Sequence, residues 1–231
     1  MKASSPALIL YVSSSIFYLL TVIFKYSDLI MVFKPMIASS MLFYYLQECK
    51  GKVNFWYTLV LILLFISGIL NIFEDEFVLI YIIIVNFFIY GILLTNTILS
   101  LFKLKIKLVN KINVSYVFIA SFFLATLAYM SIFVLFNPTS HIYYFIILYS
   151  LVLLFLGVFN TIKFIANYSK ANIHLMISTF CFIICDLFYA LYYYYYYYDF
   201  IFFRYISIIF NVINFYFLVN YFLAKRNNQL H

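Results

Sequence analysis

Long apolar runs separated by short polar breaks make up nearly the whole chain. Cutting the sequence at its charged and turn residues leaves eight runs of about 20 residues, the length that a helix rising ~1.5 Å per residue needs to cross hydrocarbon. The runs cover residues 6–24, 29–47, 54–73, 77–99, 114–136, 142–162, 173–192 and 201–223. The pattern predicts an all-α fold, a polytopic helical bundle of eight transmembrane helices that forms a single transmembrane domain over residues 1–231.

The composition narrows the class of protein further. Hydrophobic residues make up 68% of the 231 positions and charged residues only 9%. So few charges leave too little polar surface to keep a folded chain in water. Soluble enzymes, disulfide-rich secreted scaffolds and disordered chains are therefore excluded.

The basic residues in the breaks between the runs predict an orientation. With a cytoplasmic N-terminus, eleven of the fourteen lie on the cytoplasmic side. These are Lys2, Lys50, Lys52, Lys103, Lys105, Lys107, Lys111, Lys163, Lys170, Lys225 and Arg226. The positive-inside rule then places both termini in the cytoplasm, and we expect the membrane to be a bacterial inner membrane. A reporter fusion at residue 108 that gives an external signal would overturn this topology. Basic residues scattered over short loops do not form a nucleic-acid surface.

Two ionisable residues, Lys34 and Asp186, lie inside apolar runs. Each costs about 2.5 to 3.5 kcal/mol to insert, so each is a candidate functional residue. Lys34 follows Asp28 by six residues and Asp186 precedes Tyr192 by six, which puts both about 9 Å beneath the outer helix ends. We expect the two to face each other or a shared polar cavity. Two structural alternatives remain for Lys34, which either snorkels outward or pairs with Asp186.

The state of Asp186 and the role of its neighbours stay open at this point. Asp186 is either a protonated acid suited to general acid catalysis or an anion in a structural ion pair. Asn71 lies at a similar depth and shares a helix face with Glu74 and Asp75, although a solvated acidic loop also explains the two acids. Pro35 removes a backbone donor and predicts a kink beside the lysine. The cysteines and histidines have no metal-ligand spacing, and we expect no metal and no cofactor.

Motifs in the second, third and seventh runs resemble those of a known family. The second contains Lys34-Pro35, the third contains Ser67, and the seventh contains Phe182 followed by Cys185-Asp186. The chain resembles the YhhN family, the lysoplasmalogenases, which carries Lys-Pro in its second helix, Ser-x-x-Gly-Asp in its third and Phe-x-x-Ser-Asp in its seventh.

The chain departs from the family pattern at three points. Leu70-Asn71 stands where the family has Gly-Asp, and Cys185 replaces its serine. Asn220 lies in a tyrosine-rich segment that resembles a motif of the eighth helix, in which the family carries glutamine.

The resemblance implies hydrolysis of the vinyl-ether bond of a lysoplasmalogen, a membrane lysophospholipid, to a fatty aldehyde and a glycerophospho-alcohol. Asp186 would be the general acid or the base that handles water. Lys34 would bind the phosphate or set the pKa of Asp186, and Ser67 and Asn220 would contact the substrate. The family's second carboxyl group falls at Asn71, whose amide does not titrate.

The amide of Asn71 at this position has two interpretations. Either Glu74 or Asp75 supplies the second carboxyl group, or this chain has lost or changed the activity. The alternative functions are a non-catalytic lipid-binding or structural membrane protein and, third, a small-solute transporter.

Overall fold

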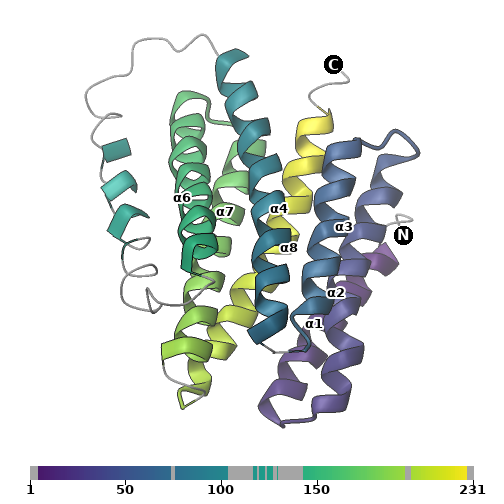
Figure 1. Ribbon diagram of the computed structural model, residues 1–231. Helices are drawn as coiled ribbons and strands as arrows, with labels where there is room; N and C mark the ends of the chain where they lie inside the picture. Colours follow the sequence, from purple (N-terminus) through teal and green to yellow (C-terminus); the bar gives the residue numbers. More distant parts are fainter. Residues whose placement is uncertain are drawn as a thin grey trace. The chain divides into compact units, whose positions relative to one another are not determined.

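The computed structural model describes residues 5–73, 76–103, 143–195 and 199–227, together with short stretches between residues 117 and 129. Seven α-helices and one π-helical turn have defined bounds in these ranges (Figure 1). They are α1 (Ser5–Ile23), α2 (Ser27–Cys49), α3 (Phe55–Leu70), α4 (Glu76–Lys103), α6 (Tyr143–Ala166), α7 (Lys170–Ala190), η2 (Leu191–Tyr195) and α8 (Ile201–Asn227). The described part of the chain is all-α, as the sequence predicts.

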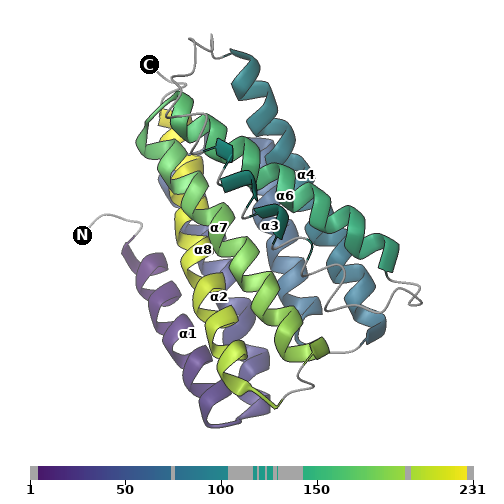
Figure 2. The same ribbon diagram turned by 90° about the vertical axis from the view of Figure 1, so that its left-hand side faces the viewer.

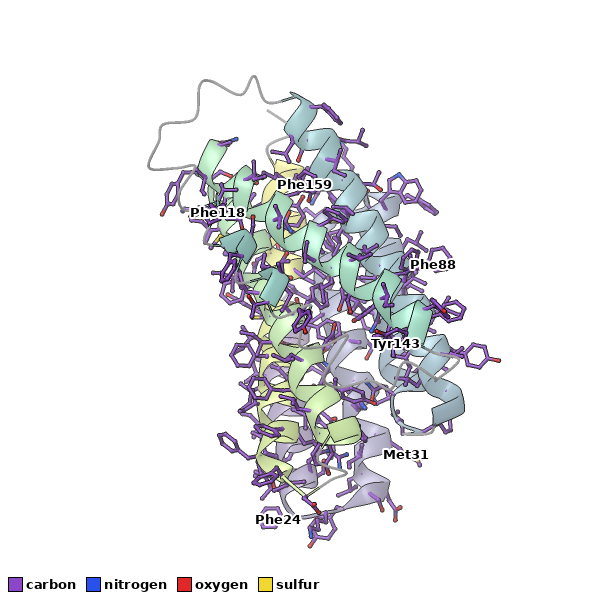
Figure 3. All side chains as sticks on the ribbon, turned by 60° about the vertical axis from the view of Figure 1, so that its left-hand side comes forward. Phe24, Met31, Phe88, Phe118, Tyr143 and Phe159 are labelled. Carbon is purple, nitrogen blue, oxygen red and sulfur yellow. The ribbon has the colours of Figure 1, made fainter. Side chains whose placement is uncertain are left out.

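Six of these helices are long and apolar enough to cross a membrane: α1, α2, α4, α6, α7 with the turn that follows it, and α8. Large apolar side chains are exposed along them, and Met31 and Phe88 are examples that project from their helices in Figure 3. Such surfaces suit contact with acyl chains rather than water. The described helices are therefore those of an integral membrane protein.

Two of the eight predicted spans, the third and the fifth, are not confirmed as helices that cross the membrane. The helix α3 has 16 residues, which rise about 24 Å, less than the ~30 Å hydrocarbon core. It is apolar but shorter than the predicted run 54–73 because Asn71 ends it as its C-cap. Most of the fifth run, 114–136, lies outside the described residues, so the count of eight spans and the orientation stay predictions.

Local sequence signals explain where several helices begin and end. The Asn54 side chain accepts hydrogen bonds from the backbone of Trp56 (3.0 Å) and Tyr57 (3.4 Å), which caps the start of α3. Ser169 accepts one from the backbone N–H of Asn172 (3.3 Å) at the start of α7. After α2, Lys50 and Gly51 both adopt positive φ, and the glycine takes φ +82° without a steric penalty.

The chain divides into two compact units, and α4 and α8 contribute residues to both. The first unit consists of Met1–Ile89 with Leu218–His231. Within it α1 packs along α2, and α2 packs against α3 (Figure 1). The end of α8 joins the same unit, because the ring of Phe222 stacks on that of Tyr57 with 4.4 Å between centroids.

The second unit is Tyr90–Phe217. In it α6 lies beside α7 in both ribbon views (Figures 1 and 2). Asn160 of α6 is buried, accepts a hydrogen bond from Thr97 of α4 (2.8 Å) and donates one to Thr179 of α7 (2.7 Å). Hydrocarbon supplies no hydrogen-bond partners, so this three-helix link satisfies groups that would otherwise be costly to bury.

Candidate functional site

The carboxyl group of Asp186 is the centre of the strongest candidate site, in the second unit. Asp186 lies on α7 and accepts a hydrogen bond at Oδ2 from the hydroxyl of Tyr90 on α4 (2.8 Å). The hydroxyl of Tyr149 on α6 donates to the same oxygen. Three helices of one unit therefore converge on a single carboxylate oxygen, and Oδ1 takes part in neither bond.

Aromatic packing orients these two hydroxyl groups. Tyr90 is almost fully buried, and its ring packs edge-on against Phe182, one turn before Asp186 on α7, with 4.9 Å between centroids. The rings of Tyr90 and Tyr149 lie 5.4 Å apart, and their hydroxyl oxygens are 3.4 Å apart. Rings held on several sides lose little further freedom when they form hydrogen bonds, so the arrangement is preorganised.

The cluster of Tyr90, Tyr149 and Asp186 can hold and move a proton. A carboxylate in a low-dielectric interior needs hydrogen-bond donors, and two phenol groups supply them as charge-assisted bonds. Because both bonds end on Oδ2, the other oxygen is the one that can carry a proton to a bound reactant. This is the chemistry expected of a general acid or base.

The sequence identified Asp186 but not its two tyrosine partners. The chain has 25 tyrosines, so neither Tyr90 nor Tyr149 stands out by residue type. A weak signal exists, because both lie well inside apolar runs rather than at the ends, where tyrosine is common in membrane helices. Their meeting at Asp186 depends on helix packing.

The ammonium group of Lys34 caps the end of α3 in the first unit. It donates to the backbone carbonyl oxygen of Asn71 (2.8 Å) and to the side-chain oxygen of the same residue (3.1 Å). A cation is stabilised there because the last carbonyl groups of a helix carry partial negative charge. The structure thus brings together two residues that the sequence singled out, and their hydrogen bonds join α2 to the end of α3.

Ser67 joins the same end of α3 to α4 rather than standing alone. The side chain of Ser67 is buried and donates to Oδ1 of Asn86 over 2.7 Å. The backbone carbonyl of Ser67 also accepts from the N–H of Asn71 (3.0 Å). Lys34, Ser67, Asn71 and Asn86 therefore form one polar cluster, which we call the α3-end cluster.

The remaining predicted site residues have different outcomes. Glu74 and Asp75 lie outside the described residues. Asn220 is half-buried on α8 in the first unit. Lys34 and Asp186 belong to different units, so their predicted pairing stays a prediction. Within the described residues, no three His, Cys, Asp or Glu side chains come together in a group that could hold a metal ion.

The fold and the site define the class of protein as a helical integral membrane protein with polar clusters inside its apolar helices. Comparison with protein-family models, with curated proteins and with solved structures finds no match for this chain.

Proposed function

We propose that this protein is a membrane lipid hydrolase of the lysoplasmalogenase type, which cleaves the vinyl-ether bond of a lysophospholipid. The observation that supports it most is the carboxyl group of Asp186, which lies within an apolar helix and accepts hydrogen bonds from Tyr90 and Tyr149. The YhhN-like motifs Lys34-Pro35 and Cys185-Asp186 point to the same chemistry.

In the proposed reaction Asp186 transfers one proton and takes one back. The protonated carboxyl group donates to the outer carbon of the vinyl ether, which leaves an oxocarbenium ion on the ether oxygen and its neighbouring carbon. Water adds to that carbon and gives its proton to the carboxylate. The resulting hemiacetal collapses to a fatty aldehyde and a glycerophospho-alcohol, so the net change is the addition of one water.

The two tyrosines act on the carboxyl group rather than on the lipid. Their bonds to Oδ2 stabilise the carboxylate that forms after proton transfer, while the nearby negative charge stabilises the oxocarbenium ion. They also hold the group in one orientation, which leaves Oδ1 to exchange the proton. In this scheme one carboxyl group serves both steps, so Glu74 and Asp75 are not required.

The test is aldehyde release from an alkenyl lysophospholipid by purified protein in lipid nanodiscs. We expect Asp186→Asn, which keeps the size of the side chain and one acceptor oxygen, to lower turnover by about 10²- to 10⁴-fold. Asp199→Asn is the matched control, because Asp199 is exposed and lies two residues before α8 begins. Absence of turnover by folded wild-type protein, or equal turnover by Asp186→Asn, would refute the proposal.

A non-catalytic lipid-binding or structural protein is the second candidate. The same three hydrogen-bonding residues join α4, α6 and α7, and such links commonly hold membrane helices together. If wild-type protein binds lysophospholipid without releasing aldehyde, this alternative is favoured. Under either function we propose a multi-pass protein of the bacterial inner membrane, with both termini in the cytoplasm.

A further inference from the structure

The helices α7 and α8 lie side by side in Figure 2, and polar side chains join them within the second unit. On α7 they are His174, Ser178 and Cys185. Their spacings of four and seven residues are about one and two helical turns, so the three share one face of α7. On α8 they are Ser207 and Asn214. We call these five residues the polar seam.

Contacts at three levels join the two helices along the polar seam. Ser207 donates to the backbone carbonyl of Cys185 (3.0 Å) at one end. Ser178 donates to Oδ1 of Asn214 (2.6 Å) two turns away. The ring of His174 packs on that of Phe217 one turn further, with 5.6 Å between centroids. The seam thus runs from the residue next to Asp186 toward the start of α7.

Two polar atoms in the polar seam have no hydrogen-bond partner among the described residues. They are Nδ2 of Asn214 and Nδ1 of His174, and both are shielded from solvent. Asn214 is completely buried, so its N–H groups cannot turn outward. Because Ser178 lies one turn from His174 on α7, and Asn214 lies one turn from Phe217 on α8, the two atoms belong to the same stretch of the seam.

A buried donor without an acceptor is unfavourable, and hydrocarbon provides no acceptor from outside. Proteins satisfy such groups with ordered water, which needs two or more polar partners around it. Asn214, His174 and the hydroxyl of Ser178 supply these partners. The fully paired Asn160 shows the contrast, since both ends of its amide meet threonine hydroxyls in the same unit.

We infer that the polar seam is a hydration site, and that the water it holds supplies the hydrolysis proposed at Asp186. The role of this water in hydrolysis rests on the proposed function, whereas the hydration site itself does not. The bonds from Ser178 to Asn214 and from Ser207 to Cys185 set an antiparallel register of α7 and α8. In this register Cys181 and Asn211 lie between the two bonds, so polar residues continue from Asn214 to Cys185. In this proposal water moves along the row of polar groups toward Asp186.

The thiol of Cys181 is a native reporter of this hydration. Protein with Cys49→Ala and Cys185→Ala retains Cys181 as its single thiol, and infrared spectroscopy in nanodiscs follows the S–H band after transfer to D2O. We expect the S–H group to exchange within minutes. In Asn214→Leu we expect exchange to slow by about tenfold, the factor that corresponds to one lost hydrogen bond of about 1.4 kcal/mol.

Asn160→Leu is the matched control, because it replaces a buried asparagine outside the polar seam and should leave exchange at Cys181 unchanged. If Asn214→Leu does not fold, water-edited solid-state NMR of the wild type gives the same information. Early magnetisation transfer from water to the side-chain nitrogen of Asn214 is expected. Slow exchange at Cys181, or no transfer to Asn214, would overturn the hydration site.

The outcomes also separate this inference from the proposed function. Rapid exchange in a protein that releases no aldehyde would leave the hydration site standing and remove the hydrolase. Slow exchange in a protein with full turnover would do the reverse. A parallel loss of exchange and turnover in Asn214→Leu would support both.

Discussion

The two units of this protein pair the polar groups of their apolar helices in different ways. In the first unit cations bind the ends of neighbouring helices, since Lys34 binds the carbonyl oxygen of Asn71, and Arg226 binds those of Glu48 (3.0 Å) and Cys49 (2.7 Å). In the second unit the carboxyl group of Asp186 and the amide group of Asn160 bind the hydroxyl groups of other side chains. Ser67 binds the side chain of Asn86 in the same way in the first unit.

The difference shows which ionisable residue is better suited to chemistry. A cation that binds backbone carbonyl oxygens stabilises the end of a helix, so its contribution is structural. A carboxylate that is held by two hydroxyl groups has partners that orient it without neutralising it by an opposite charge. The second unit is therefore the better place to look for proton transfer, although the sequence singles out both residues.

Of the variants that test this difference between the units, the largest effect is expected at Tyr149, on the rate of aldehyde release. Tyr149→Phe removes one of the two donors to Asp186 and should lower aldehyde release by about 10- to 100-fold, the factor that follows from one charge-assisted bond of about 1.5 to 3 kcal/mol. Tyr144→Phe is the control, since Tyr144 is exposed on the same helix. Equal turnover in the two variants would assign Tyr149 to packing alone.

A smaller effect, on stability, is expected at Lys34. Lys34→Met leaves both oxygens of Asn71 without this charged donor and should reduce the free energy of unfolding by about 2 kcal/mol. Chemical unfolding in mild detergent measures the change, with Lys52→Met, at an exposed loop residue, as the control. If Lys34→Met unfolds like the wild type but binds lysophospholipid more weakly, Lys34 serves the ligand and the comparison fails.

The smallest effect is expected in the Asn160 link of the second unit. Thr97→Val leaves Oδ1 of Asn160 without its donor and should cost about 0.6 to 1.7 kcal/mol, the range for hydrogen bonds between membrane helices. Thr95→Val is the control, because Thr95 is exposed and its hydroxyl binds the backbone carbonyl of Gly91 within α4 (2.8 Å). The same detergent unfolding should separate the two variants, and equal stability would show that the link contributes nothing.

Much of the helix pattern could be predicted from sequence, because the length of an apolar run reports directly on the thickness of hydrocarbon. The run 173–192 became α7 with the turn η2, and the run 201–223 became the greater part of α8. The end of α3 was less predictable. An apolar run does not show that Asn71 caps the helix early, since this depends on the backbone conformation and on Lys34 of another helix.

The amino-acid sequence predicts a helical membrane protein in which Lys34 and Asp186 need hydrogen-bond partners. These properties follow from composition and periodicity, which are local along the chain. The identity of these partners depends on the tertiary structure: the end of α3 for Lys34, and two tyrosine hydroxyl groups for Asp186. Tyr90 and Tyr149 lie 59 residues apart, and their meeting depends on helix rotation and packing, which no single apolar run encodes.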